Sequence, residues 1–512
     1  MARRFSFLLA LLLAAPAQAA MPSRETRVDA VVARHAGSPP ALRVLLQKMP
    51  KGGDLHNHLD GSVYAEDYLK WASDDGDCIA RTTRAISPPP CTSDQVPAKD
   101  LVSRDPQFYQ ETIDALSMRN FVPGLGTGEV SGHDHTFATF PRFGAVAAAH
   151  LADSLVVTRM QAAADNVSYI EQIADPAVAF SSLLLGQAGP AGSADFETAR
   201  TALEPILPGL VAAARAQFDA AEATAKSRCR ARPVPPDCAV QVRYLFFVLR
   251  TLPPQQAFAQ MALGFALVKA DPRFVGVELV APEDDPVALR DFQLQMLMFQ
   301  FFEKSAPQVR LSLHAGELAL GLVPPSELGF HIAESIDVAG ARRIGHGYSI
   351  AHEINVKLLL AEMAQKRIAV EINLTSNAIT PGIAGAEHPL ALYRAAHVPV
   401  TLAADDEGVF RIDLTHEYVR AVTEQHLRYR DLKEIARNGL EYSFLPGGSL
   451  WMGGDYRAPA PACAAGVPGG EAKAPACARL LAGSEKAAAQ WRLEGALARY
   501  EDAVLAGWFT AP

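Results

Sequence analysis

Two histidines near the start of the chain have the spacing of a metal-binding pair. His56 and His58 are separated by one residue and are followed by a glycine, Gly61. If residues 51–58 form a strand, both imidazoles point to the same side, because side chains alternate between the two faces of a strand. Two imidazoles on one face at a strand end can hold one metal ion. The alternative interpretation is a turn with two solvated histidines.

Further metal-ligand types follow apolar segments much later in the chain. His314 ends the apolar segment 309–314, and Asp405 follows the apolar segment 398–403. His314 would add a third imidazole to the first pair, and Asp405 would add an oxygen. Three histidines and one carboxylate suit Zn²⁺ with a position left for water. We therefore predict one zinc ion held by His56, His58, His314 and Asp405.

Other polar residues beside these candidates have types suited to catalysis. Glu317 follows His314 by three residues, and Asp406 follows Asp405 directly. Of two adjacent aspartates at a strand end, one can face a metal and the other a substrate. The usual explanation for such a pair is a solvated turn. His346 lies between two glycines, which allow close backbone approach. A buried, satisfied histidine is the alternative for His346; its strand-end position favours catalysis.

Apolar segments predict the fold that would gather these residues. Eight segments read as strands, and stretches with helical spacing, such as 291–304 and 351–366, lie between them. Strands that alternate with helices predict an α/β protein with a (β/α)8 TIM barrel. The predicted strands are 51–58, 167–173, 240–249, 274–280, 309–314, 343–346, 368–374 and 398–403.

In such a barrel the carboxyl ends of all strands open onto one face. Polar residues that are hundreds of positions apart would therefore meet in one pocket. The residues expected there are His56, His58, Glu171, His314, Glu317, His346, Asn373, Ser376, Asn377, Asp405 and Asp406.

The remaining segments are expected to surround the barrel. We assign 21–50 to an N-terminal helical extension, 51–445 to the barrel and 446–512 to a Gly/Pro/Ala-rich loop with a closing helix at 485–506. Residues 64–104, with three consecutive prolines, are interpreted as an insertion or long excursion rather than core.

A second His-x-His sequence occurs at His133 and His135, after several glycines. We expect it to lie in a loop, at the surface or lining a pocket, and not to bind metal. The phenylalanines of residues 136–143 belong either to the core or to the wall of an apolar pocket.

The first twenty residues have the pattern of a signal peptide. Arg3 and Arg4 precede an apolar stretch at 5–15 that is too short to span a bilayer, and Ala17 and Ala19 fit a cleavage site. A buried N-terminal helix is the alternative. No later segment reaches the length of a membrane span. We predict Sec-dependent export of the mature protein to a bacterial periplasm or beyond the cell.

Six cysteines fit an oxidising location. They form three close pairs, Cys78 with Cys91, Cys229 with Cys238, and Cys463 with Cys477. Each pair encloses an irregular segment, so three local disulfides are expected. Free thiols are the alternative; a metal role is disfavoured because no pair has C-x-x-C spacing.

Composition restricts the class of partner. The 512 residues are 49% hydrophobic and carry a formal net charge of -9. A chain of this length and apolar content can bury a large core, in one big domain with insertions or in several smaller ones. Nothing indicates nucleic-acid binding, which would require a basic patch.

The order and wide spacing of five motifs, over roughly residues 50–440, resemble the adenosine deaminase family. The signal peptide, the cysteine-bearing region after the first motif and the segment 279–284 are most similar to its secreted, growth-factor-like branch. The motifs are His56-x-His58-Leu59-Asp60-Gly61, His314-Ala315-Gly316-Glu317, Gly345-His346-Gly347, Thr375-Ser376-Asn377 and Asp405-Asp406.

This resemblance implies a TIM barrel, one zinc ion and hydrolytic deamination of adenosine or 2'-deoxyadenosine to the inosine product and ammonia. It implies that His346 and Asp405 orient and deprotonate the attacking water, and that Glu317 acts as an acid toward N1 of the purine. A homodimer formed through residues 21–50 and 64–104 is a further expectation, by analogy with the secreted branch.

The resemblance also implies residues that contact the substrate. Asp406 would hydrogen-bond N7, Asp60 would meet the ribose, and the backbone of Gly316 would lie beside the purine edge. Ala281 would take the place of a family glycine whose backbone approaches the purine.

Three residues depart from the family pattern. Besides Ala281, they are Pro282, which has no N–H to donate, and Glu407, which replaces a proline that commonly follows the aspartate pair. None of these changes touches the metal residues or Glu317. They leave open an amidohydrolase that acts on another aminated purine or a nucleotide, and a nucleotide would require an Arg or Lys clamp. A binding or growth-factor-like protein without activity is the remaining alternative.

Overall fold

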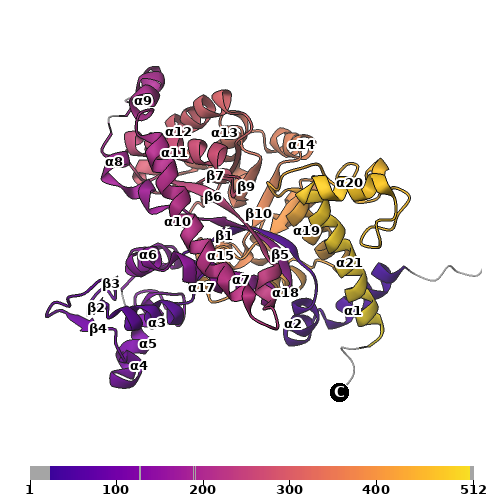
Figure 1. Ribbon diagram of the computed structural model, residues 1–512, viewed down its shortest axis with the longest axis horizontal. Coiled ribbons are helices and arrows are strands. Elements are labelled where there is room, and N and C mark those ends of the chain that lie inside the picture. The colour runs from indigo at the N-terminus through magenta and orange to yellow at the C-terminus, as the bar shows by residue number, and fades with distance from the viewer. Residues whose placement is uncertain (1–22, 126–127, 188, 191, 508–512) are drawn as a thin grey trace, which may run out of the picture.

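The computed structural model describes residues 23–507 except 126, 127, 188 and 191. The expected signal peptide lies outside the described residues. Eight parallel strands form a nearly closed barrel with helices around it (Figure 1), and all eight predicted strands are confirmed. In barrel order they are β1 (Gly52–His58), β5 (Val167–Ile173), β6 (Gln241–Leu249), β7 (Phe274–Val280), β8 (Arg310–Ala315), β9 (Arg343–His346), β10 (Ala369–Ile372) and β11 (Val400–Leu402).

The first and last strands meet through backbone hydrogen bonds made by residues of the candidate site. The N–H of Asp405 donates to the carbonyl of His56 at 3.1 Å, and the N–H of His58 donates to the carbonyl of Asp405 at 3.2 Å. Asn57 and Asp405 form a parallel bridge. We call this junction the closing seam, because it joins the two ends of the sheet.

Helices cover the outside of the barrel, as expected for a βα repeat. The predicted helices at 291–304 and 351–366 correspond to α12 (Pro286–Ser305) and α14 (Val356–Lys366), and a short 3-10 turn at Tyr348–His352 precedes α14. Other covering helices are α7 (Leu151–Ala164), α10 (Leu207–Ser227), α11 (Pro254–Ala270), α13 (His331–Asp337), α16 (Leu390–Ala395), α18 (Leu414–Thr423) and α19 (Tyr429–Glu441).

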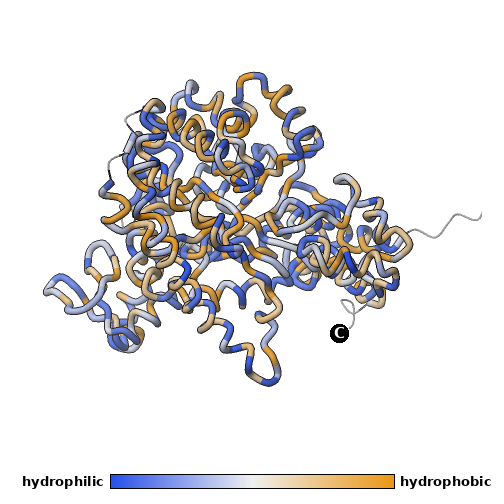
Figure 2. The backbone as a smooth tube through the Cα atoms, turned by 45° about the horizontal axis from the view of Figure 1, so that its top comes forward, coloured by the Kyte–Doolittle hydropathy of each residue, from blue (hydrophilic) through white to orange (hydrophobic). Residues whose placement is uncertain are grey.

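The two ends of the described chain lie side by side. Helices α1 (Arg24–His35) and α21 (Glu485–Leu505) pack against each other and against α19 (Figure 1). Helix α2 (Pro39–Gln47) packs on α18, and α20 (Pro475–Gly483) packs on α21. Apolar segments run through the body of the molecule (Figure 2). Among the helices that the structure describes, none has both the length and the apolar character to cross a membrane.

The region after β1 folds into a unit with its own core. It contains α3 (Ala65–Asp75), a small antiparallel sheet of β2 (Cys78–Ala80), β3 (Ile86–Ser87) and β4 (Gln95–Pro97), then α4 (Leu101–Arg104), α5 (Pro106–Ala115) and α6 (Gly132–Ala149). Tyr68, Trp71, Ile79 and Phe143 are buried together in it. The excursion predicted at 64–104 is therefore part of a packed unit that continues through α6.

The expectation that His133 and His135 lie in a loop is wrong. Both belong to the first turn of α6, where the hydroxyl of Ser131 accepts a hydrogen bond from the N–H of Asp134 at 3.0 Å and caps the helix. The preceding glycines mark the segment before the helix. His133 contacts the Asp284 carboxylate at 2.9 Å, so α6 is tied to the loop after β7.

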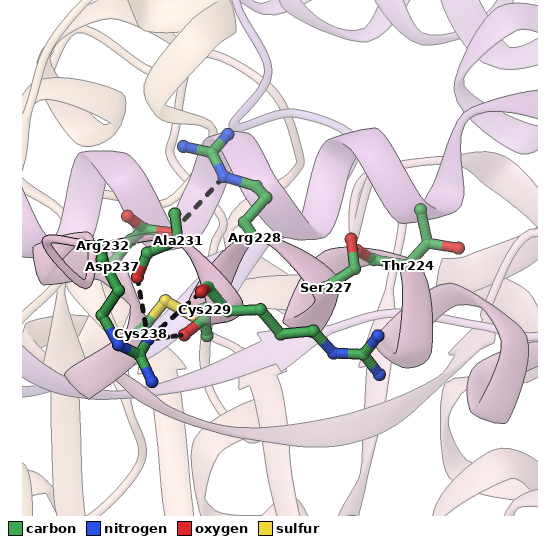
Figure 3. The surroundings of a disulfide bond; sticks show 9 residues. Thr224, Ser227, Arg228, Cys229, Ala231, Arg232, Asp237 and Cys238 are labelled. Carbon is green, nitrogen blue, oxygen red and sulfur yellow. Dashed lines mark hydrogen bonds and ion pairs between the residues drawn. A yellow bond between two sulfur atoms is a disulfide. The ribbon is translucent and has the colours of Figure 1, made fainter.

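All three expected disulfides are present, between Cys78 and Cys91, Cys229 and Cys238, and Cys463 and Cys477. Figure 3 shows the second, which joins the 3-10 turn after α10 to the turn at Pro236–Ala239 before β6. The guanidinium of Arg232 donates to backbone carbonyls in the loop that this disulfide closes.

Candidate active site

A cavity of about 750 Å³ opens at the carboxyl ends of the barrel strands. This is the face where barrels place their functional groups. The sequence-predicted residues that line it are His58, Asp60, Ala281, His314, Glu317, His346, Ser376, Asp405 and Asp406. His56 lies directly beneath, fully buried.

Imidazole nitrogens and one carboxylate converge at the base of the cavity. The Nε2 atoms of His56 and His58 lie 3.4 and 3.3 Å from Oδ1 of Asp405. The Nε2 atoms of His58 and His314 lie 3.2 Å apart. His56 Nε2 is buried and has no hydrogen-bond partner among the described residues. A buried, orphaned ring nitrogen beside two other imidazoles and a carboxylate fits a metal ligand set.

Two of these imidazoles, His56 and His314, have their other ring nitrogen held by a buried carboxylate. His56 Nδ1 lies 2.8 Å from Glu371 of β10, and His314 Nδ1 lies 3.0 Å from Glu278 of β7. Metal-binding histidines typically donate their other ring N–H to such partners, which fix the tautomer and the ring orientation. Burial opposes ionisation of Glu371, but Arg343 and His56 hold its pKa well below its usual range. Glu371 therefore stays an acceptor for His56.

His346 stands between the carboxylates of Glu317 and Asp405. Its Nε2 lies 3.7 Å from Glu317 and 3.9 Å from Asp405, and its Nδ1 lies 2.9 Å from the side-chain oxygen of Asn377. One ring nitrogen of His346 lies within 4.8 Å of possible ligand atoms of His56, His314 and Asp405. The position suits either orientation of a water molecule or direct participation in the cluster.

Glu317 faces the cavity on a segment fixed from behind by Glu283. The Glu283 carboxylate accepts from the N–H of Gly316 at 3.3 Å and of Glu317 at 2.6 Å, and contacts His331 at 2.6 Å. Arg250 lies 3.4 Å from the same carboxylate. Burial raises the pKa of Glu317, which favours the protonated carboxyl that an acid requires.

The structure turns the backbone N–H of Gly316 toward Glu283 and not toward the cavity. Gly316 has φ +70°, and a side chain there would meet Ile332 and Ser349. Among the described residues that line the cavity, Gly316 does not occur. The glycine serves the turn that presents Glu317.

Asp406 and Asp60 complete the polar side of the cavity. Burial, followed by the neighbouring charge of Asp405, raises the pKa of Asp406 well above its usual range. A Cβ at Gly61 would lie 1.7 Å from Asp406 Oδ1, so glycine is required where the first motif passes this carboxyl. Asp60 is exposed to the cavity, in a position to meet a polar group of a ligand.

The departures from the family pattern have different structural consequences. Ala281 and Pro282 line the cavity, and Ala281 has φ +81°, a conformation that favours glycine. Glu407 begins α17 (Glu407–Phe410), is buried, and is not among the described cavity-lining residues. Only the first two departures can affect the ligand directly.

We expect Ala281→Gly to stabilise the protein by about 0.5–1 kcal/mol, because glycine adopts positive φ without a Cβ clash. The free energy of unfolding is measured by denaturant titration of the wild type and the variant. The control is Ala361→Gly, on the exposed face of α14. The control should lose about 1 kcal/mol, since glycine weakens a helix interior. Equal losses in both variants would contradict strain at position 281.

Glu171, expected with the strand-end cluster, does not join the cavity. Its carboxylate lies 2.5 Å from Arg343 and accepts from the Tyr169 hydroxyl and the N–H of Phe444. All these groups are buried in the barrel interior. A buried carboxylate needs such partners, and here they come from the barrel itself.

Sequence reasoning missed the carboxylates that support the site, Glu278, Glu283 and Glu371. Glu278 and Glu371 each lie in the middle of an apolar strand. A charged residue is rarely buried without a partner, so a glutamate inside an apolar strand indicates a buried polar partner nearby. This was the sequence signal that could have identified Glu278 and Glu371.

The fold and the site define a barrel enzyme with a buried His/Asp cluster that is consistent with a metal centre. The chain belongs to the adenosine deaminase family, because residues 158–449 match the family described as "Adenosine deaminase". It is similar to an aminodeoxyfutalosine deaminase of Streptomyces coelicolor (42% identity over 106 residues) and to an adenosine deaminase of Salmonella heidelberg (36% over 139 residues). These alignments cover 20% and 27% of this chain, and 27% and 38% of the relatives' own lengths.

Two solved structures share the fold at low sequence identity. One is an adenine deaminase from Arthrobacter aurescens, with 18% identity and TM-score 0.50 over 78% of this chain and 94% of that one. The other is the Arabidopsis protein ADAL in complex with GMP, with 21% identity and TM-score 0.50 over the same shares. At this identity they establish the barrel architecture.

Proposed function

We propose that the protein is a zinc-dependent deaminase that converts adenosine or 2'-deoxyadenosine to inosine or 2'-deoxyinosine and ammonia. One observation carries the proposal: the His56, His58, His314 and Asp405 cluster lies at the base of the same cavity that Glu317 faces. His56, His58, His314 and Asp405 would hold the ion. When bound, zinc lowers the pKa of water and supplies a nucleophile at neutral pH.

The chain's own residues supply the proton transfers. His346 and Asp405 are 3.9 Å apart and would orient the attacking water and accept its proton. Glu317, kept protonated by burial, would donate a proton to N1 as the purine C6 is attacked. Asp406 would hydrogen-bond N7, and its raised pKa supports a protonated carboxyl able to donate to that nitrogen.

Export and kinship with the secreted, growth-factor-like branch are part of the same proposal. The pattern of residues 1–20 and the three disulfides support an oxidising location. Detection of the protein in periplasmic or culture fractions, cleaved after Ala19 or Ala20, tests this part. Light scattering of the mature chain tests the predicted homodimer.

The experiment for activity uses the purified chain from residue 21 onward, with zinc content measured. Adenosine is added, and both the purine absorbance and released ammonia are followed. We expect one zinc per chain, and one inosine and one ammonia formed for each adenosine consumed. Bound zinc without turnover of adenosine or 2'-deoxyadenosine would refute the substrate assignment, and a chain that binds no zinc would refute the mechanism.

A further inference from the structure

The cavity is divided into a reactive half and an apolar half. Reactive groups follow β8, β9, β11 and β1, on one side of the barrel mouth. The ends of β5, β6 and β7, on the other side, contribute Ile173, Phe247, Leu249 and Val280. The two halves therefore face different parts of any ligand that occupies the whole cavity.

Helix α6 extends the apolar half with one of its faces. Phe137, Phe140, Gly144 and Ala148 recur at helical spacing and line the cavity. Val146 and Ala147 of the same helix pack into the core of the inserted unit. The phenylalanines predicted to be either core or pocket wall thus serve both purposes, since Phe143 belongs to that core and also reaches the cavity.

An exposed aromatic ring marks the same half. Phe180 lines the cavity yet is 45% exposed, and its ring lies 6.0 Å from that of Phe247. Exposed apolar surface inside a concave site gains free energy when an apolar ligand group covers it.

Charge argues against a phosphate in this cavity. Of the described residues that line it, none is lysine or arginine, whereas Asp60, Asp285, Glu317, Asp405 and Asp406 are acidic. A phosphate would find none of the guanidinium or ammonium partners that it requires, and the carboxylates of Asp60 and Asp285 would repel it.

Resting on the proposed function, we propose that the preferred substrate is an uncharged adenine nucleoside with an apolar thioether or alkyl group at the 5' position. The purine 6-position must lie at the His/Asp cluster, so a substituent that fills the apolar half must be attached at the far end of the nucleoside. Asp60, which follows β1 between the two halves, would meet the sugar hydroxyls. Phe140, Phe180 and Phe247 are the specificity-determining residues.

The test compares kcat/KM of the zinc-loaded protein for 5'-deoxy-5'-methylthioadenosine, adenosine and AMP. We expect the thioether to exceed adenosine by about tenfold, the discrimination typical of small apolar groups in a matching pocket. AMP should fall about 100-fold or more below adenosine. Turnover of adenosine with equal or slower turnover of the thioether, or with comparable turnover of AMP, would overturn the inference; turnover of none would instead refute the proposed deaminase.

Variants at Phe180 test whether this residue determines the preference for the thioether over adenosine. Because Phe180 is half-exposed, its replacement should leave the fold intact. Phe180→Ala should reduce the thioether-to-adenosine ratio of kcat/KM about tenfold, and Phe180→Leu should retain most of it. Phe180→Arg should raise the AMP-to-adenosine ratio about tenfold by adding a cation. Unchanged ratios in all three variants would place the preference elsewhere and refute this assignment.

A binding measurement separates recognition from chemistry. Calorimetry with Glu317→Gln, which is expected to bind without turnover, should give a lower Kd and a more negative heat-capacity change for 5'-deoxy-5'-methylthioadenosine than for adenosine. Equal Kd and equal heat-capacity change would show that the apolar half is not occupied, and would overturn the inference.

Discussion

Replacement of Glu317 by glutamine is expected to lower kcat for adenosine about 10²–10⁴-fold, the usual contribution of a positioned acid. Glutamine has nearly the same size and can still hydrogen-bond, but it has no acidic proton to transfer to the purine ring. The side chain lies in the cavity and its backbone N–H is held by Glu283, so the loop should keep its conformation. Steady-state kinetics and product analysis measure the effect.

The control for this variant makes the same chemical change at the surface. Glu387→Gln alters an exposed carboxylate in a short 3-10 turn and should leave kcat unchanged. Zinc content and Tm should match the wild type in both variants. Retention of more than a tenth of kcat by Glu317→Gln at full zinc content would show that another group supplies the proton.

Asp405→Asn is expected to lower both zinc content and kcat, the latter by about 10³-fold or more. Its carboxylate is 3.4 and 3.3 Å from two imidazole nitrogens, and although burial opposes ionisation, the hydrogen bond with His56 and the neighbouring imidazoles lower the pKa of Asp405. The amide of asparagine carries no charge to offset the cation. Metal analysis after dialysis gives the first effect, and kinetics at saturating zinc give the second.

The neighbouring carboxyl provides a matched comparison. Asp406→Asn changes the next residue, also buried, and should keep zinc and lose less kcat than Asp405→Asn, because the asparagine amide can still donate a hydrogen bond where a protonated carboxyl did. Metal linkage also predicts that added zinc raises Tm less for Asp405→Asn than for Asp406→Asn. Full zinc binding by Asp405→Asn, or loss of zinc by Asp406→Asn alone, would reverse the roles of the two aspartates.

The barrel was predictable because its strands are short apolar runs separated by long helical segments. Even β9 and β11, with four and three residues, lie within the predicted segments 343–346 and 398–403. His56 and His58 could be paired from strand alternation alone. His314 and Asp405 could be added only through the prediction that all strand ends share one face.

The errors arise where tertiary contacts determine the outcome. Glu171 resembles a strand-end catalytic carboxylate, but Arg343, 172 positions later in the sequence, neutralises it inside the barrel. His133 and His135 follow a glycine-rich segment that indicates a loop, yet a serine cap starts a helix there. Sequence gives no direct account of Glu283, whose partners come from separate segments of the chain.

The closing seam has a consequence for local stability. The backbone groups that join the two ends of the sheet belong to His56, His58 and Asp405, whose side chains also converge on the candidate metal position. Opening the seam would therefore also separate the ligands, so that ion binding and barrel closure oppose the same local opening. Amide protons of His58 and Asp405 should exchange with solvent far more slowly after zinc is added, while those of the exposed turn at Gly385–Glu387 should exchange at the same rate with and without the ion.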